Sequence, residues 1–394
     1  MAEPGTSRTA RLRVLVPLFT FVRFLSSTAF RMVYPFLPAF RDGLGVSVAS
    51  LNTAIGARSL VAGLLGPFIA TWGDIRGRKT GMLLGMALFI VGAATVAFWP
   101  TFAGFTLAMM LTILGKITFD PAIQAYLGDR VPYARRSQVL TLTELSWSGA
   151  YILGIPAVGW VIARAGWIAP FPLLGLLVLL LAVLIWFWVP KDPPVEGRDT
   201  GRVLKKFGEI LSSPTAVTGL VFAGLICVAN EIINLTFGVW MEASFGLQLA
   251  ALGASAAVLG AAELGGEGLV ALITDRLGKR RSILLGTLVN CVAVAALPFV
   301  GGSLPLALTA LFLFYISFEF TIVSTIPLMT EVMPQARATM MAGFFTFASF
   351  GRALASGLST WLYEIGFGAS VSAVLAANLL AILVLRNLRL EHDA

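Results

Sequence analysis

The chain has 394 residues, of which 58% are hydrophobic and only 12% are charged, and its formal net charge is +8. A soluble globular protein carries about 25% charged residues, so this composition excludes a soluble domain and indicates a multi-spanning membrane protein. Basic loops at one membrane face account for the positive charge, and we therefore expect no nucleic-acid partner. The two cysteines are isolated and the one histidine, His392, lies in the C-terminal tail, so we expect neither a disulfide framework nor a metal site.

Twelve apolar stretches are long enough to cross a bilayer, which takes roughly 20 mostly apolar residues. The first stretch carries Arg23 and Arg31, and we interpret it as a membrane helix and not as a cleaved signal peptide. The sequence thus predicts an all-α membrane protein with helices near residues 14–37, 48–71, 80–98, 102–127, 138–163, 168–189, 214–240, 248–273, 282–300, 304–329, 338–363 and 367–386.

One long polar stretch, residues 191–213, divides six predicted helices from six. We therefore predict an N-terminal six-helix bundle over residues 1–190, a cytoplasmic central loop over 191–213 and a C-terminal six-helix bundle over 214–394. Residues 208–211, near the end of this loop, are a candidate for a short interfacial helix.

A basic segment between the second and third predicted helices, residues 73–79, occurs again half a chain later. In both copies an aspartate is followed three residues later by a glycine and then by two cations, and Asp275 follows Asp74 by 201 residues. A glycine at this point allows a tight turn with positive φ. Basic turns between helices are common, but two copies half a chain apart indicate a duplicated architecture.

A second pair of segments repeats with nearly the same offset. An acid, a proline and an arginine occur in order in residues 129–135, after the fourth helix, and in residues 331–337, after the tenth. The corresponding residues are 202 apart. Two proline-containing loops could arise independently, but the agreement of the two offsets favours duplication.

The distribution of cations predicts the orientation. With the N-terminus inside, the segments on the cytoplasmic side hold 21 lysines and arginines, whereas the outer side holds only Arg41 and Arg164. Cytoplasmic loops of membrane proteins carry this excess of positive charge. We therefore expect a multi-pass protein of the cytoplasmic membrane with both termini in the cytoplasm.

The charged residues within the predicted helices also follow a pattern. A charge that faces lipid costs at least about 2.5–3.5 kcal/mol, so helices that carry charges must face protein or water. Helices 3, 6, 9 and 12 carry none, which indicates a three-helix unit used four times. The charges within the other helices are Arg23, Arg31, Arg58, Lys116, Asp120, Glu144, Glu231, Glu263, Glu267, Glu319 and Arg352.

These features resemble the major facilitator superfamily of secondary transporters, in particular its drug/proton antiporters, over essentially the whole chain. The resemblance implies that helices 1, 4, 7 and 10 line a central cavity, that 2, 5, 8 and 11 form the interface between the halves, and that the rest support them. The basic loop departs from the family pattern, because Ile75 stands where an arginine usually follows the acid, and Ala70 and Ala271 replace a glycine.

The resemblance also implies that the repeated loops are gates. In the family the loop acid faces the start of a helix in the other half, which would bring Asp74 near Arg337 and Asp275 near Arg136. The predicted gating residues are Asp74, Gly77, Arg78, Lys79, Asp275, Gly278, Lys279, Arg280, Arg136 and Arg337.

Glycines and a proline in the fifth helix, namely Gly149, Gly154, Pro156 and Gly159, resemble a degenerate form of a motif associated with exporters of the family. Glycine-mediated helix packing is an equal alternative. The arginine that many antiporters carry near the start of helix 4 is not in its usual place, and Lys116 lies more than one turn further on.

Three arginines make the N-terminal half cationic: Arg23 and Arg31, eight residues apart near one face of the first helix, and Arg58 in the second. Guanidinium groups suit an anionic or zwitterionic substrate group, whereas the alternative is that they pair with acids to hold the bundle. The predicted substrate-binding residues are Arg23, Arg31, Arg58, Lys116, Asn230, Glu231, Asn234 and Glu319.

Carboxylates must carry any transported proton, because no histidine lies in the membrane. Glu263 and Glu267 are four residues apart and share a helix face, so we expect the pair to share a proton. The alternatives are that both face water, or that Glu319 or Asp120 is the carrier. Lys116 and Asp120 are also four apart and predict an internal ion pair. The predicted proton-coupling residues are Glu263, Glu267, Asp120, Glu319 and Arg352.

The sequence therefore predicts a secondary transporter, not an enzyme, that exports a small organic or amphiphilic solute by alternating access and couples this to protons. It contains no glycine-rich phosphate loop, so ATP is not expected to drive it. The alternatives are a lipid or lysolipid transporter, an uncoupled uniporter or importer, a receptor, and a membrane enzyme that works without histidine. We expect a monomer in the lipid bilayer, with a small-molecule solute and protons as partners and no cofactor.

Overall fold

The computed structural model describes residues 4–190 and 207–388, and the side chains of residues 4–11, 70–75, 133, 134, 137 and 335 fall outside the description. The described residues are helical almost throughout and contain no strand, so the predicted all-α class is confirmed. Residues 207–211, near the end of the predicted central loop, form a short helix, and residues 191–206 of that loop lie outside the described part.

The first half contains six membrane-length segments and one short helix. Its elements are α1 (Pro4–Arg31), α2 (Leu37–Leu44), α3 (Val48–Arg76), α4 (Arg78–Phe98), α5 (Phe102–Arg130), α6 (Tyr133–Gly149), the π-helix η1 (Ala150–Gly154), α7 (Ile155–Ala165) and α8 (Pro170–Trp188). The predicted fifth span consists of α6, η1 and α7 in succession.

The described part of the second half also contains six long helical segments, but its π-helix lies in the second of them and no short helix follows the first. Its elements are α10 (Pro214–Phe245), α11 (Leu249–Leu269), the π-helix η2 (Val270–Thr274), α12 (Asp275–Leu277), α13 (Lys279–Ala296), η3 (Leu297–Phe299), α14 (Leu304–Val332), η4 (Pro334–Ala336), α15 (Arg337–Ile365) and α16 (Phe367–Arg386). Eleven helical segments of the described chain are long and apolar enough to cross a membrane, and α15, with 29 residues, is the further long helix at the predicted eleventh position. The predicted twelve-helix architecture is confirmed.

The first span differs from the prediction at its end. The apolar stretch continues to Pro35, but α1 ends at Arg31, residues 32–36 form turns, and α2 begins at Leu37. Pro35 lacks the backbone N–H that a continuing helix would use, and proline also disfavours helical geometry in the residue before it. The break places Tyr34 between two helices.

Local signals in the sequence set several helix ends. Ser47, Thr101 and Ser213 each accept a hydrogen bond from a backbone N–H in the first turn of the next helix. Such caps satisfy N–H groups that have no partner within the helix. The glycines of the repeated loop, Gly77 and Gly278, have φ of 95° and 85°, as the motif predicts, and this lets the chain turn directly from one span into the next.

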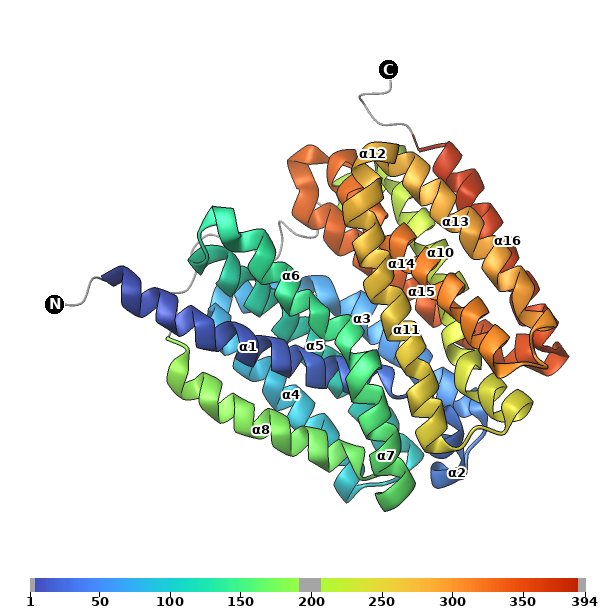
Figure 1. Ribbon diagram of the computed structural model, residues 1–394. Helices are drawn as coiled ribbons and strands as arrows, with labels where there is room; N and C mark the ends of the chain where they lie inside the picture. Colours follow the sequence, from blue (N-terminus) through green and yellow to red (C-terminus); the bar gives the residue numbers. More distant parts are fainter. Residues whose placement is uncertain (1–3, 191–206, 389–394) are drawn as a thin grey trace.

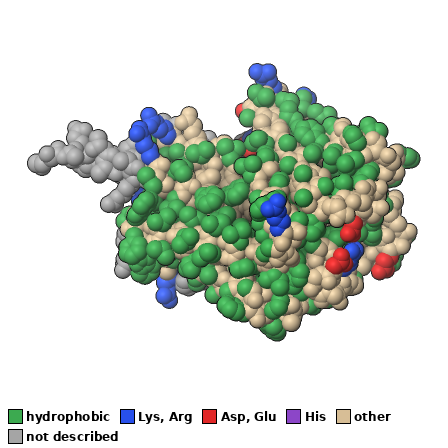
Figure 2. Space-filling model, turned by 60° about the horizontal axis from the view of Figure 1, so that its bottom comes forward, with side chains coloured by type: hydrophobic (Ala, Val, Ile, Leu, Met, Phe, Trp, Pro, Cys, Tyr) green, Lys and Arg blue, Asp and Glu red, His purple; other side chains and the backbone are tan. Residues whose placement is uncertain are grey.

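The order of the helices in space follows the three-helix unit. Between the halves, α3 packs against α15, and η1 and α7 pack against α11. On the flanks α4 packs against α8, and α13 against α16. Only 28% of the α8 span is buried, and apolar side chains cover most of the face shown in Figure 2. Apart from the basic residues at their ends, these helices carry no charge and present the surface that suits lipid.

The two ends of the molecule differ. At one end, which we call the sealed end, the loops after α2, α7, α10 and α15 lie together and α2 packs against α10. The carbonyl oxygens of Tyr34 and Pro35 approach Gly238 so closely that a Cβ there would lie 2.6 Å from each. Toward the opposite end, which we call the splayed end, the halves diverge, with the start of α6 far from α12 (Figure 1).

Candidate functional site

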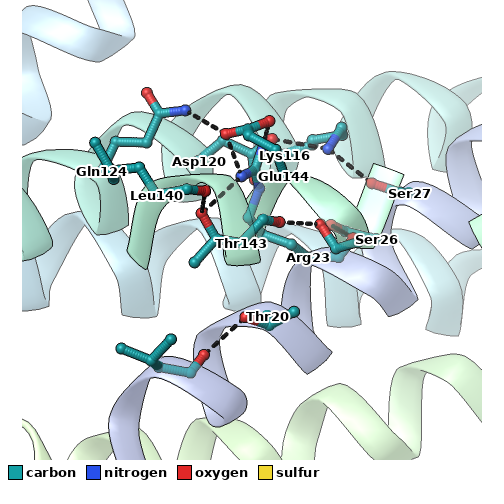
Figure 3. Close-up of polar contacts among 12 residues, drawn as sticks. Thr20, Arg23, Ser26, Ser27, Lys116, Asp120, Gln124, Leu140, Thr143 and Glu144 are labelled. Carbon is teal, nitrogen blue, oxygen red and sulfur yellow. Dashed lines mark hydrogen bonds and ion pairs between the residues drawn. The ribbon is translucent and has the colours of Figure 1, made fainter. Parts of the chain in front are cut away.

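Arg23 in the middle of α1 is the centre of a group of charged side chains in the first half (Figure 3). Its guanidinium donates two hydrogen bonds to Glu144 of α6, with Nη1 2.6 Å from Oε1 and Nη2 3.0 Å from Oε2. Its Nε lies 3.4 Å from a carboxylate oxygen of Asp120 on α5. This paired geometry is the strongest way for arginine to hold a carboxylate.

Lys116 completes this group. Its Nζ lies 2.7 Å from Asp120, which is the predicted ion pair between residues four apart, and it also donates to the hydroxyl of Ser27 at 3.1 Å. The four residues Arg23, Lys116, Asp120 and Glu144, which we call the Arg23 cluster, therefore contain two cations and two carboxylates, and all belong to the first half. The Arg23 side chain is 6% exposed, whereas that of Glu144 is 42% exposed.

Arg31, two turns further along α1, has a partner in the other half. Its Nη1 donates to both oxygens of Glu263 on α11, at 2.9 and 2.7 Å. The two side chains are 2% and 7% exposed. The guanidinium also lies 3.6 Å from the centre of the Trp147 ring and 4.1 Å from that of Tyr151, which gives it cation–π contacts. This ion pair therefore crosses the interface in a region closed to water.

Tyr34, in the break after α1, joins the halves a second time. Its hydroxyl accepts a hydrogen bond from Arg58 of α3 at 2.8 Å and donates one to Glu231 of α10 at 2.8 Å. Asn234 donates to Glu231 at 3.3 Å, and Tyr315 of α14 donates to Asn234 at 2.6 Å. We call these five residues the Tyr34 network. Four of the predicted substrate-binding residues belong to it or touch it, because Asn230 accepts from Asn234 at 2.9 Å.

The predicted proton-coupling carboxylates have different surroundings. Glu263 is held by Arg31, whereas Glu267, one turn away, accepts a weak hydrogen bond from Ser148 of α6 at 3.4 Å. Glu319 of α14 is 7% exposed and packs against Gly266, where a Cβ would lie 2.7 Å from its own Cβ. The cation that pairs with Glu263 is Arg31 and not Arg352 of α15, which the sequence interpretation placed near it.

The repeated basic loops contact the second repeated segment of their own half. Arg78 lies 3.1 Å from Asp129, and at the equivalent place in the second half Lys279 pairs with Glu331. The next cation in each loop caps the end of a helix, because Lys79 donates to the carbonyl of Trp186 and Arg280 to that of Arg386. We call these two ion pairs the loop latches. They explain physically why both segments recur with nearly the same offset.

The sequence interpretation predicts that each loop acid contacts the other half, with Asp74 near Arg337 and Asp275 near Arg136. The side chain of Asp74 lies outside the described part of the chain. Asp275 is exposed and forms no ion pair with any described residue, and Arg337, the first residue of α15, is exposed as well. Arg136 lies in the first turn of α6. The gating role of these four residues stays a prediction.

The glycines of the fifth span lie at close approaches of helices. Gly154 packs against Thr28 of α1, and the α-carbon of Gly159 approaches the carbonyl of Leu249 so that a Cβ would lie 2.9 Å from it. Pro156 packs near Gly253 of α11, and Gly149 has Phe24 as its neighbour. The π-helix η1, which begins after Gly149, brings Tyr151 toward Arg31. Bulges of this kind are frequent at functional sites.

An ion pair at the rim of the sealed end also connects the halves. Arg41 of α2 hydrogen-bonds to Asp42 at 2.7 and 3.2 Å and lies 3.5 Å from Glu242 of α10. All three side chains are at least partly exposed. The hydrogen bond from Arg41 is the main cause that lowers the pKa of the Asp42 carboxyl below its ordinary value of 3.8.

The sequence interpretation missed several residues of these sites. Tyr34, Trp147, Tyr151 and Tyr315 stand in apolar stretches, where aromatic residues are usually lipid-facing or core residues. Glu144 was recognised as a charge within a helix but was not assigned a role. The neighbouring residues could have indicated a polar site around Glu144, since residues 141–148 contain five hydroxyl or carboxyl side chains in an otherwise apolar span.

The profile of the Major Facilitator Superfamily matches residues 19–356, and the chain therefore belongs to this family of transporters. The "Multidrug resistance protein MdtG" of Yersinia enterocolitica is 28% identical over 72% of this chain and 71% of its own length. The "Cis,cis-muconate transport protein" of Acinetobacter baylyi is 23% identical over 82% and 84%.

A likeness to a solved structure agrees with the fold. The inward-facing, unoccupied form of a bacterial homologue of the human lysosomal transporter Spinster superposes with a TM-score of 0.73. It covers 98% of this chain and 96% of its own, at 16% sequence identity. The protein is thus a multi-pass membrane transporter built on the twelve-helix fold of its family.

Proposed function

We propose that the protein is a secondary active transporter that exports a small organic or amphiphilic solute across the cytoplasmic membrane and couples export to protons. The observation that carries this proposal is the Arg31–Glu263 pair, a buried ion pair that links α1 of the first half to α11 of the second. Alternating access needs interactions between the halves that form in one state and break in the other. A buried pair of opposite charges on separate bundles meets that requirement.

In this proposal the splayed end faces the cytoplasm and the sealed end faces outward. The basic loops with Arg78 and Lys279 lie at the splayed end, and the positive-inside rule places such loops in the cytoplasm together with both termini. The rim pair of Arg41 and Glu242 then lies at the extracellular face. The described conformation is accordingly inward-facing.

Cross-linking at the sealed end tests alternating access directly. In a variant without Cys227 and Cys291, Arg41→Cys and Glu242→Cys introduce one thiol in each half. Reaction with a short bifunctional thiol reagent should abolish solute flux in proteoliposomes, and a cleavable reagent should restore it after reduction. Each single-cysteine variant is the control. Unchanged flux in the cross-linked protein would exclude a mechanism in which the halves separate at this end.

The names of the relatives and the charge of the first half support the solute class. One relative is named for resistance to several drugs and another for transport of a dicarboxylate. Arg23 and Lys116 lie on the helices that line the central cavity in this family, so an organic acid would meet two cations there. The glycines and proline of the fifth span support export.

Proton coupling is assigned to Glu263 and Glu267, with Arg31 as the counter-charge. A proton that reaches Glu263 removes one of the two charges of the buried pair and weakens the link between the halves. Glu267 lies one turn nearer the splayed end and is partly exposed, so it can pass the proton on. Glu319 and Asp120 remain the alternative carriers.

The test uses proteoliposomes with an imposed pH gradient and an internal pH-sensitive dye. Organic acids and amphiphilic cations are added one at a time, and a transported solute should cause a proton movement that wild type shows and protein-free vesicles do not. In Glu263→Gln/Glu267→Gln, exchange without a gradient should survive while gradient-driven accumulation is lost. Glu364→Gln, an exposed carboxylate on α15, is the matched control. Accumulation that persists in the double variant would exclude Glu263 and Glu267 as the proton carriers and make Glu319 the next candidate.

A further inference from the structure

Among the described membrane carboxylates that pair with an arginine, Glu144 has the most exposed side chain. Glu263 and Asp120 are closed off, with side chains 7% and 17% exposed, whereas the Glu144 side chain is 42% exposed although its partner Arg23 is buried. Gln124 of α5, which donates to Glu144 at 3.0 Å, is exposed as well. Glu144 is therefore the most exposed group in contact with the buried guanidinium of Arg23 (Figure 3).

The geometry at Arg23 is that of a bound carboxylate ligand. Two terminal guanidinium nitrogens face the two oxygens of Glu144, which is the fork arrangement that arginine offers to any carboxylate. Thr143 accepts a third hydrogen bond from Nη1 at 3.3 Å, so the guanidinium keeps its orientation without Glu144. The Nε of Arg23 makes no hydrogen bond with a described residue but lies 3.4 Å from Asp120, so the two terminal nitrogens are the ones that face Glu144.

The charges of the cluster allow Glu144 to leave. Asp120 keeps Lys116 at 2.7 Å and lies 3.4 Å from Arg23, so neither becomes an isolated charge. Glu144 itself can turn toward water, because its side chain is already partly exposed. Departure of Glu144 without a replacement would leave the cluster with one excess positive charge, and an incoming anion would restore neutrality. Arg31 offers no such exchange, because both members of the Arg31–Glu263 pair are buried.

We propose that Arg23 and Lys116 form an anion subsite in which Glu144 occupies the place of a substrate carboxylate, so that an organic acid from the splayed end displaces Glu144 and binds Arg23 with both oxygens. This rests on the proposed function and specifies its substrate class. Trp147, one turn from Glu144 on α6, is partly exposed and lies 5.4 Å from the Lys116 ammonium. Arg31 covers one face of that ring at 3.6 Å, so a flat apolar body behind the carboxylate can contact the part of the ring that stays exposed, and the class is an amphiphilic or aromatic carboxylate.

The test measures binding and not flux. Benzoate is titrated by calorimetry into the full-length protein in detergent, and benzamide, which has the same shape without the charge, is titrated in parallel. Because an internal competitor lowers apparent affinity by the fraction of protein in which the site is free, Glu144→Gln should bind benzoate about tenfold more tightly than wild type. Glu144→Ala should behave in the same way. Glu364→Gln should match wild type, and benzamide should bind weakly to all four proteins.

The double variant Arg23→Ala/Glu144→Gln should lose the gain in affinity, and Arg23→Lys/Glu144→Gln, which keeps the charge but not the fork, should retain only part of it. The proposal is overturned if benzoate binds wild type and Glu144→Gln equally or binds neither, if benzamide binds as well as benzoate, or if the gain survives without Arg23. A protein that binds benzoate as expected but moves no solute in proteoliposomes would instead refute the transport function and leave the subsite standing.

Discussion

Two arginines eight residues apart on the same helix perform different structural tasks. The guanidiniums of Arg23 and Arg31 are both buried and both hold a glutamate with paired hydrogen bonds. The partner of Arg23 belongs to the same half and reaches water, whereas the partner of Arg31 belongs to the other half and does not. The comparison shows that the helix supplying the acid decides whether an ion pair holds a bundle together or joins two bundles.

Two further kinds of ion pair extend the comparison to the surface. Each loop latch, such as Arg78–Asp129, lies within one half and is exposed through its acid, and the rim pair Arg41–Glu242 joins the halves and is also exposed. Whether an ion pair is buried is therefore independent of whether it lies within one half or between the halves. Burial should set the energy of each pair, because water screens exposed charges, and location should set whether its loss affects folding or the conformational equilibrium.

The largest effect is expected at Arg31. Arg31→Ala leaves Glu263 buried without a partner, and the removal of one member of a buried ion pair costs about 3–5 kcal/mol. The double variant Arg31→Ala/Glu263→Gln should recover most of this loss because no isolated charge remains. The free energy of unfolding in mixed micelles measures both. A double variant as unstable as Arg31→Ala would mean that the contacts of Arg31 with Trp147 and Tyr151 stabilise the protein more than the ion pair does.

A smaller loss is expected at Arg23, although its own side chain is almost as buried. In Arg23→Ala the freed Glu144 can be solvated and Asp120 keeps Lys116, so the cost should be about 1.5–3 kcal/mol, the range for lost charged hydrogen bonds. The free energy of unfolding of Arg23→Ala, measured in the same way, is compared with that of Arg31→Ala. If the two substitutions cost the same, exposure of the acid does not set the energy and the distinction between the two sites fails.

The sequence predicted the parts of this comparison that depend on local spacing. The twelve helices follow from the length of the apolar stretches, the Lys116–Asp120 pair follows from a separation of four residues, and Gly77 has the positive φ that its motif requires. Each of these depends on residues close in the chain, where helix geometry alone fixes the neighbours.

The partners of the two arginines were not predictable in the same way. Glu144 lies 121 residues from Arg23, and Glu263 lies 232 residues from Arg31. Helical periodicity states which face of α1 carries an arginine, but not which helix crosses that face at the same depth. The role of Tyr34 was not predicted for another reason. Tyr34 joins the halves at the break in the helix before Pro35, and the continuous apolar stretch gives no sign of that break.

The two loop latches should each contribute little to the free energy of unfolding, and by similar amounts. Asp129→Asn and Glu331→Gln each remove the acid of one latch, and exposed ion pairs contribute about 0.2–1 kcal/mol. Because the two latches occupy equivalent positions in the halves, the two losses should agree within the error of the unfolding measurement, and both should shrink at high salt. A loss above about 2 kcal/mol in one variant alone would show that the duplicated loops no longer have equivalent roles.

The smallest effect is expected at Asp42, which orients Arg41 toward Glu242. The hydrogen bond from Arg41 lowers the pKa of Asp42 in the folded protein, so its contribution is complete above the ordinary value of 3.8 and is lost as the pH falls through the lowered pKa. Asp42→Asn should therefore destabilise the protein by no more than about 0.5 kcal/mol at pH 7. At a pH well below 4 the variant and wild type should converge, because protonated Asp42 no longer binds Arg41 as an ion. Unfolding midpoints measured from pH 3 to pH 7 test this, with Glu364→Gln as the control for general acid effects. A difference that persists unchanged at acid pH would show that Asp42 acts through packing, and the rim of the sealed end would then not depend on charge.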